Sequence, residues 1–252
     1  MATLTFLGTG TAVPTIGHDN TYLALEGEQS TLLIDCAGSP LLKLQLAGIE
    51  PSQLQYVILT HRHPDHIYGF SVLLLGLWWL GCQTALQVLG EAEGLRAAQA
   101  LLSAFRPLEE WPGFCPPVYR EVQLQNSSLV LDLPDLLITA SPTAHVIQGL
   151  MLKIQNKASG RAIVYSGDTA PCESLVRLAY GAEVLIHEAS GEYVGHSSAA
   201  QAGQAAQRAG VKKLYLIHYP ALTVNLNALL AQARQEFSGE VELARDFGTC
   251  EF

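Results

Sequence analysis

Short apolar runs separated by turn residues extend along most of the chain, and this pattern predicts short strands interspersed with helices. The runs predict strands at 3–7, 21–26, 29–35, 57–59, 85–89, 118–124, 129–133, 136–140, 149–155, 162–165, 183–186, 213–217 and 241–244. Longer amphipathic or apolar stretches predict helices at 39–47, 67–81, 91–105, 172–180, 198–209 and 224–237. Strands that alternate with helices indicate a layered α/β protein.

Composition supports one large folded unit. The 252 residues contain 49% apolar and 15% charged residues, and no linker-like segment divides them, so we expect a single domain spanning residues 1–252. The five cysteines are odd in number and form no C-x-x-C motif, which argues against a disulfide framework. The longest apolar run, 70–82, is too short to cross a bilayer as a helix, so a cytoplasmic protein without a membrane span is expected.

The charge balance bears on the substrate. The net charge is -9 at pH 7, and only 14 lysines and arginines are spread along the chain. Proteins that grip a nucleic acid backbone usually present a basic stripe, because counterion release supplies much of the affinity. The composition therefore disfavours an RNA substrate without excluding one, since folding can still assemble a local basic patch.

The richest chemistry lies in Thr60-His61-Arg62-His63-Pro64-Asp65-His66, directly after a predicted buried strand. His61 and His63 are two residues apart, so in extended backbone they point the same way and can bind one metal together. Asp65 and His66 begin a predicted helix and point elsewhere, where a second metal could bind. The alternative is a surface turn that happens to be rich in histidine.

Other polar residues also lie at the ends of predicted strands. His145 follows the strand at 136–140, Asp168 lies in the turn Ser166-Gly167-Asp168-Thr169, and His218 ends the strand at 213–217. Asp35 ends another apolar run, where it could orient a metal-bound histidine or merely bond to backbone; we favour the first. One strand-end histidine alone is more often structural, but the order of these residues favours a metal site.

That order, H-x-H-x-D-H followed by His, S-G-D and a strand-terminal His, resembles the metallo-β-lactamase superfamily. The resemblance covers nearly the whole chain and implies a four-layer αββα fold, with two mixed β-sheets between helices. It also implies two zinc ions per subunit, one held by His61, His63 and His145, the other by Asp65, His66 and His218, with Asp168 bridging them. Such a pair activates a water molecule for attack. The same ligands would also accept manganese or iron.

Within the superfamily the chain is most similar to the tRNase Z group and its phosphodiesterase relatives. The similarity rests on Phe6-Leu7-Gly8-Thr9-Gly10, on the S-G-D turn, on His187-Glu188-Ala189 and on His196-Ser197-Ser198. It implies that His196, supported by Glu188, protonates the leaving oxygen of a phosphodiester, with Asp65 as a further catalytic residue. The alternative for His196 is a helix N-terminal residue with no catalytic task. Strand alternation points His187 away from Glu188 and out of the site.

Departures from the group concern how the substrate is held. Only 22 residues separate His145 from Asp168, where the group often inserts an RNA-gripping arm, and Tyr219-Pro220-Ala221 follows His218 in place of the usual residues. We therefore expect a two-zinc phosphodiesterase whose substrate is a small diester rather than tRNA. The alternatives are a tRNA 3′-end endonuclease, a hydrolase of small esters, sulfate esters, lactones or thioesters, and a non-catalytic binding protein. The apolar stretch 67–81, together with the dimers that related enzymes form, also predicts a homodimer.

Overall fold

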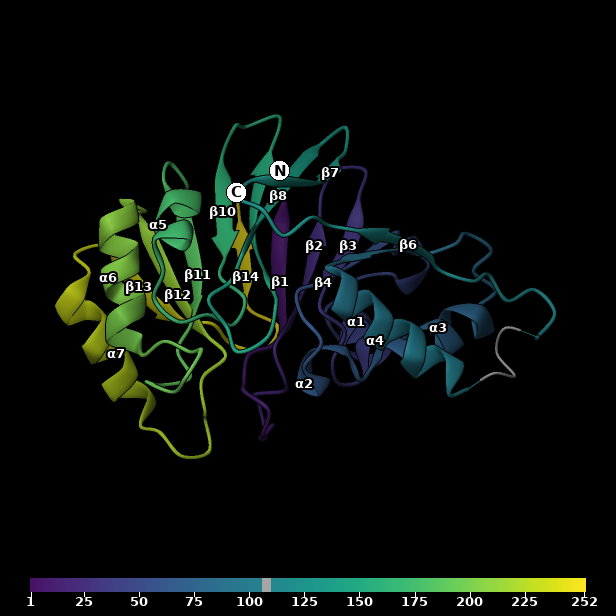
Figure 1. Ribbon diagram of the computed structural model, residues 1–252, viewed down its shortest axis with the longest axis horizontal. Helices are drawn as coiled ribbons and strands as arrows, with labels where there is room; N and C mark the ends of the chain where they lie inside the picture. Colours follow the sequence, from purple (N-terminus) through teal and green to yellow (C-terminus); the bar gives the residue numbers. More distant parts are fainter. Residues whose placement is uncertain (106–109) are drawn as a thin grey trace.

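The computed structural model describes residues 1–105 and 110–252, and it contains two seven-stranded sheets packed face to face (Figure 1). The first sheet has the order β14 (Thr249–Glu251), β1 (Thr3–Gly8), β2 (Tyr22–Glu26), β3 (Thr31–Ile34), β4 (Tyr56–Leu59), β5 (Gln87–Gly90) and β6 (Val118–Glu121). The second has the order β13 (Glu240–Leu243), β12 (Lys213–Ile217), β11 (Val184–Glu188), β10 (Ala162–Tyr165), β9 (Leu150–Asn156), β8 (Leu136–Pro142) and β7 (Ser128–Asp132).

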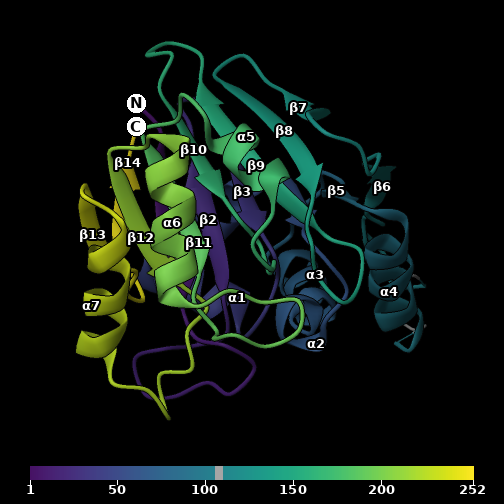
Figure 2. The same ribbon diagram turned by 60° about the vertical axis from the view of Figure 1, so that its left-hand side comes forward.

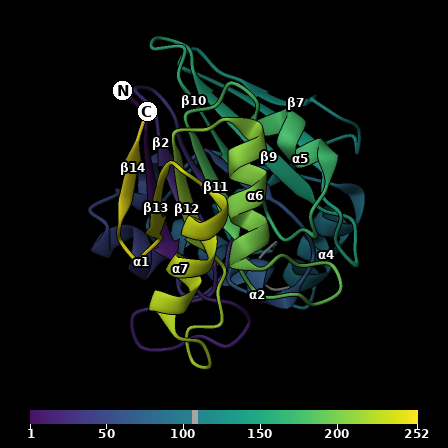
Figure 3. The same cartoon turned by 90° about the vertical axis from the view of Figure 1, so that its left-hand side faces the viewer.

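Helices cover the outer face of each sheet. The first sheet is covered by α1 (Pro40–Leu46), α2 (Pro64–Ile67), α3 (Phe70–Trp79) and α4 (Ala92–Ser103), with the short 3₁₀ helix η1 (Pro51–Gln53) nearby. The second is covered by α5 (Glu173–Ala179), α6 (Ala199–Ala209) and α7 (Leu226–Glu236). Figures 2 and 3 show α6 and α7 lying over β11, β12 and β13. The predicted four-layer arrangement is confirmed.

Alternation along the strands explains these layers. In β3, Leu32 and Ile34 pack between the two sheets, whereas Leu33 packs against the helices. The same period of two recurs in β1, where Phe6 faces the second sheet and Leu7 faces the helix layer. Each sheet is therefore apolar on both faces, and the strands read in the sequence as nearly continuous apolar runs.

Parallel pairing brings the ends of the site-bearing strands to one edge. β3, β4 and β5 are parallel in the first sheet, and β10, β11 and β12 are parallel in the second. β8 runs in the same direction as β10, because each of them pairs antiparallel with β9. Ligand sites in such sheets lie beyond the carboxyl ends of the strands, and the predicted site residues follow β4, β8, β10 and β12.

The structure differs from the predicted elements in a few places. The predicted helix at 67–81 begins only at Phe70, because Pro64 opens the separate helix α2 and a break at Gly69 follows it. A Cβ atom at Gly69 would lie 2.9 Å from the carbonyl oxygen of Ala37, so only glycine fits this close approach. β14 was not predicted. The sequence also predicts an irregular loop at 107–117, and part of that segment lies outside the described residues.

Two expectations concern cysteines and membranes. All five cysteines are free, which confirms the expected lack of a disulfide framework. Within the described parts of the chain, every helix is too short or too polar to cross a membrane. The apolar run 70–82 instead forms α3, which buries Phe70, Leu73 and Leu77 against the first sheet and leaves Trp79 78% exposed. The apolar run predicts that Trp79 is a packing residue, and its exposure contradicts that prediction.

Candidate active site

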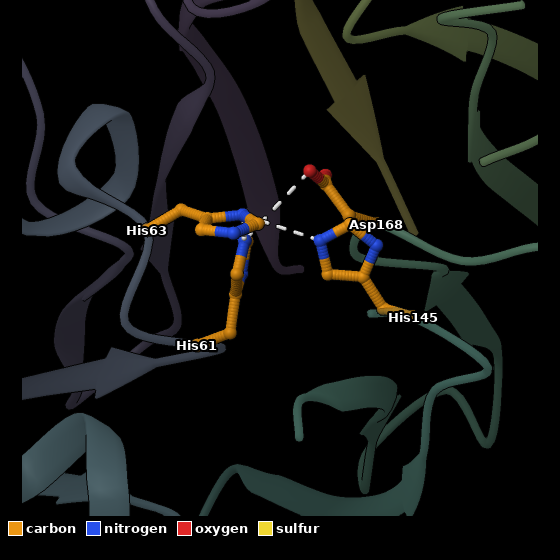
Figure 4. A group of neighbouring side chains, drawn as sticks. All are labelled: His61, His63, His145 and Asp168. Atoms are coloured by element: carbon orange, nitrogen blue, oxygen red, sulfur yellow. Dashed lines mark hydrogen bonds and ion pairs between the residues drawn. The ribbon is translucent and has the colours of Figure 1, made fainter. Parts of the chain in front are cut away.

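Seven side chains gather beyond the ends of four strands. Their ligand atoms form two groups, each with its atoms within 4.8 Å of one another: His61, His63, His145 and Asp168 in one, and Asp65, His66 and His218 in the other. Figure 4 shows His61 and His63 entering the first group from one side and His145 and Asp168 from the other. The structure therefore brings together every residue for which the sequence predicts a metal-binding role.

Asp168 connects the two groups through a single oxygen atom. Its Oδ2 lies 3.7 Å from His61 Nε2, 3.6 Å from His66 Nε2 and 3.2 Å from His218 Nε2. This carboxylate follows β10 in a turn where Gly167 has a φ of +55°, and a Cβ atom there would lie 2.8 Å from the carbonyl oxygen of Leu150. Glycine thus lets the turn pass close to β9 and places Asp168 between the histidines.

The donor set fits metal ions. His63 Nδ1 lies 3.0 Å from His61 Nε2 and 3.2 Å from His145 Nε2, so three imidazole nitrogens converge on one point. Among the described residues, the buried atoms His66 Nε2 and Asp168 Oδ1 find no hydrogen-bond partner. Buried polar atoms are rarely left unsatisfied, and imidazole nitrogens with carboxylate oxygens are the usual ligands of zinc. These residues could therefore hold two divalent ions.

Electrostatics agree with cation binding. Burial, with a further contribution from His66, lowers the pKa of His61 well below its usual value, which favours the neutral ring that binds metal. Burial also acts to lower the pKa of His66, but the carboxylates of Asp168 and Asp35 outweigh it and raise that pKa well above the usual value. The two carboxylates therefore favour a positive charge at this position, and a bound cation would supply it.

Outer contacts fix which nitrogen of each ring faces the site. His66 Nδ1 lies 2.8 Å from Asp35 Oδ2, and His145 Nδ1 donates to the carbonyl oxygen of Gly195 over 2.8 Å. In both rings Nε2 is thus left free for the cluster. Asp35 is itself held, because its carboxylate accepts hydrogen bonds from the Thr60 amide (2.7 Å) and hydroxyl (2.9 Å). This geometry favours the orienting role for Asp35 over a purely backbone role.

We expect Asp35→Asn to weaken metal binding by about 10–100-fold, because an amide orients His66 less strongly than a carboxylate does. Dissociation constants measured by competition with a chelating dye check this. Asp132→Asn serves as the control, since this exposed side chain pairs only with Lys157 in the described structure. Equal affinities in the wild type and Asp35→Asn would contradict the orienting role.

Glu188 and His196 form a hydrogen-bonded pair beside the candidate metal ligands. Glu188 ends β11 with its side chain fully buried, and its Oε1 lies 2.9 Å from His196 Nδ1. Backbone amides of Thr169 (2.9 Å) and Ser190 (3.0 Å) also donate to this carboxylate. The hydrogen bond that His196 donates to Glu188 raises the pKa of His196, so the ring retains its proton at higher pH than usual. The His196 ring contacts the His145 ring at a centroid distance of 4.7 Å.

A cavity of about 560 Å³ opens onto these groups. Its lining consists of Thr11, Ala12, His63, Pro64, Asp65, Asp168, Ser190, Tyr193, Val194, His196, His218 and Pro220. No lysine or arginine belongs to this lining within the described chain. His187 is buried and does not line the cavity, in agreement with the direction that strand alternation predicted. Its Nδ1 donates to the carbonyl oxygen of Glu188.

Comparison with known proteins identifies the family. The family model described as beta-lactamase superfamily domain matches residues 30–219. The chain belongs to the beta-lactamase superfamily. Among its superfamily relatives, the ribonuclease Z of Methanothermobacter thermautotrophicus is 27% identical over 305 residues, covering 100% of this chain and 97% of that protein. The ribonuclease Z of Mycobacterium sp. strain KMS is 29% identical over 271 residues, covering 98% and 94%.

Solved structures of the superfamily share the fold. The Bacillus subtilis protein YhfI superposes with a TM-score of 0.80 at 23% identity, covering 100% of this chain and 99% of YhfI. The short form of human tRNase Z also gives a TM-score of 0.80, at 24% identity, covering 99% and 98%. The predicted resemblance to the superfamily and to its RNase Z-like branch is confirmed, and the chain is a metal-dependent hydrolase.

Several contacts that build the site had no signal in the sequence. The Gly195 carbonyl that orients His145 is a backbone atom, and so are the amides of Thr169 and Ser190 that hold Glu188. Tyr193 and Val194 were also not predicted as lining residues, because nothing in their spacing distinguishes them from an ordinary loop. Only the position of this loop between Glu188 and His196 could have drawn attention to them.

Proposed function

We propose that the protein hydrolyses phosphodiesters at a centre of two divalent metal ions, zinc being the best match to the ligands. The hydrogen-bonded pair of Glu188 and His196 beside the metal ligands carries this proposal. An alkoxide leaving group must be protonated as its bond to phosphorus breaks, and a protonated histidine at the site can donate that proton. Activated esters have no such need, so the pair favours a phosphodiester over the lactone or thioester alternatives.

The residues divide the reaction between them. His61, His63, His145 and Asp168 would hold one ion, and Asp65, His66 and His218 the other, with Asp168 shared. When bound, such ions lower the pKa of water and stabilise negative charge on phosphoryl oxygens. As the water oxygen bonds to phosphorus and the ester bond breaks, His196 gives its proton to the leaving oxygen. Asp65 lines the cavity and offers a carboxylate that can accept the proton of the attacking water.

A small diester is favoured over tRNA by the segments that this chain lacks. The alignment with the Methanothermobacter ribonuclease Z spans 305 positions against 252 residues here, so that relative contains segments with no counterpart in this chain. Between His145 and Asp168 the structure holds only β9, a turn and β10. The cavity lining also offers no cation for additional phosphates within the described chain.

Processing of the tRNA 3′ end is the second candidate, supported by relatives named ribonuclease Z along nearly their whole length. Parallel assays separate the two. Zinc-loaded protein, with Asp168→Ala as the blank, is given a tRNA precursor with a 3′ trailer and a small chromogenic phosphodiester. Turnover of the small diester alone supports the proposal. Cleavage of the precursor at one site near the acceptor stem, far faster than the diester, would establish the second candidate instead.

We expect Glu188→Gln to move the alkaline limb of the pH–rate profile to lower pH. Glu188 raises the pKa of His196, and the acid must be protonated, so the rate falls as pH rises through that pKa. Without the carboxylate the proton is lost at lower pH. The matched control is Glu192→Gln on the same loop, whose carboxylate accepts from Ser198 Oγ and does not contact His196 within the described structure. An unshifted limb in Glu188→Gln would contradict the role of the pair.

An exposed apolar patch supports the predicted homodimer. α1 and α3 pack together where Gly76 admits the side chain of Leu41. They expose Leu42, Leu46, Val72, Leu75 and Trp79, and Leu80 directly after α3 is also exposed. We expect a dimeric mass by light scattering at micromolar concentration and a monomeric mass for Trp79→Glu, because a buried charge opposes association. Leu129→Glu, at an exposed position on β7, should remain dimeric. A monomeric wild type would contradict the prediction.

A further inference from the structure

The loop between Glu188 and His196 is fixed at its base. Gly191 N donates to the carbonyl oxygen of Ser197 over 3.0 Å, which closes the loop. Ser190 Oγ donates to the carbonyl oxygen of His218 (2.9 Å), and Ser197 Oγ donates to that of Thr169 (2.7 Å). These bonds attach the loop to the turns that carry the metal ligands His218 and Asp168. The base of the loop is therefore attached to both sides of the site.

That tip presents two apolar side chains to the cavity. Tyr193 is 70% exposed and Val194 is 85% exposed, and both belong to the cavity lining. The Tyr193 ring lies close to Gly191, where φ is +123° and a Cβ atom would approach ring atom Cε2 to 2.9 Å. Two turn bonds, from Tyr193 N to Gly191 O (2.9 Å) and from His196 N to Tyr193 O (3.0 Å), set the position of the tip.

Exposed aromatic and branched side chains at a fixed position beside a reaction centre indicate a surface for substrate. Burying these side chains against a ligand is favourable, because it removes their apolar surface from water. Ala12 and Pro220 add apolar surface to the same cavity, and its lining offers no lysine or arginine within the described chain. The cavity is thus suited to one phosphate next to an apolar group, and poorly suited to a chain of phosphates.

We propose that Tyr193 and Val194 form a specificity wall that binds an aromatic, base-like group on the leaving alcohol of the diester. The inference rests on the proposed function and adds to it which of the two ester groups of the substrate the protein recognises. His196 lies three residues after Tyr193 on the same loop, and it must reach the leaving oxygen. The group attached to that oxygen therefore lies nearest the loop tip, where its planar face can stack on the Tyr193 ring.

A single mixed diester, methyl 2-phenylethyl phosphate, tests this by internal competition. Hydrolysis breaks one of two P–O bonds and releases either methanol or 2-phenylethanol, whose alkoxides are of similar basicity and need the same acid. The product ratio is measured by NMR and depends neither on the amount of enzyme nor on its metal content. The wild type should release 2-phenylethanol about tenfold more often than methanol, a preference typical of one stacking contact.

Variants assign the preference to the wall. Tyr193→Ala should bring the ratio close to one, whereas Tyr193→Phe should keep it. Tyr180→Ala should also keep it, because Tyr180 is equally exposed at the end of α5 but does not line the cavity. A ratio that Tyr193→Ala leaves unchanged, or a wild type that prefers to release methanol, would overturn the inference alone. A wild type that releases neither alcohol would overturn the proposed function together with it.

Discussion

Replacing His196 with alanine is expected to slow hydrolysis of a dialkyl phosphate by about 10²–10⁴-fold, the contribution that a positioned general acid usually makes. The physical reason is the poor leaving ability of an unprotonated alkoxide. A p-nitrophenyl diester, whose leaving group is a stable phenolate, should be slowed far less. Steady-state rates for the two diesters, measured side by side on each variant, check this difference.

The difference between leaving groups separates an acid from a merely structural residue. If His196→Ala slowed both diesters equally, His196 would act on the metal centre or on packing rather than on the leaving oxygen. Metal content is therefore measured with each rate, and we expect it to be unchanged. His18→Ala is the matched control: its half-buried ring contacts Thr9 and Tyr219 and belongs to neither ligand group.

The clustering of the candidate ligands could be predicted from the sequence because four of the seven lie within His61 to His66. The other three each follow a strand that a run of apolar residues reveals. These three strands run in the same direction within one sheet, so their carboxyl ends lie at the same edge, where the order of the motifs predicts a shared site. The hydrogen bond between Asp35 and His66 agrees with the predicted orienting role, since Asp35 directly follows β3, which lies beside β4.

Contacts made by backbone atoms could not be predicted in this way. The Gly195 carbonyl orients His145 across 50 residues of sequence, yet any residue type offers a carbonyl. β14 was missed for a related reason: Thr249–Glu251 contains three residues with no apolar run, and it is a strand only because β1 offers it an antiparallel edge. Partners distant in sequence decide both features, and local patterns carry no information about such partners.

The loop tip illustrates a further limit. Tyr193 and Val194 would ordinarily be read as residues of a surface loop, and their exposure by itself is unremarkable. Their significance depends on the bonds that attach the loop to Thr169 and His218, because these place the exposed tip at the cavity. The candidate metal ligands follow strand ends, whereas the proposed specificity wall lies on a loop, as binding residues often do when a rigid scaffold positions them.

Replacing Asp168 with asparagine is expected to have the largest effect on metal binding. Asp168 Oδ2 approaches histidines of both ligand groups, so its charge supports both proposed ions at once. The loss should exceed the about 10–100-fold that removal of an outer partner costs, leaving one equivalent of zinc or less after purification. Elemental analysis, with the rate on a phosphodiester measured on the same samples, checks this.

A buried carboxylate can also be important for folding alone, and Asp246→Asn controls for that. Asp246 is nearly buried and pairs with Lys43 at 2.9 Å, away from the ligand groups. Its replacement should lower the thermal unfolding temperature, because Lys43 then keeps only Asp19, at 3.4 Å, as a carboxylate partner. The metal content should stay full, because Asp246 belongs to neither ligand group. Asp168→Asn should show the opposite pattern: a folded protein that has lost metal and activity. If Asp168→Asn still bound two equivalents with unchanged affinity, Asp168 would not be the shared ligand, and the two groups would have to bind their ions independently.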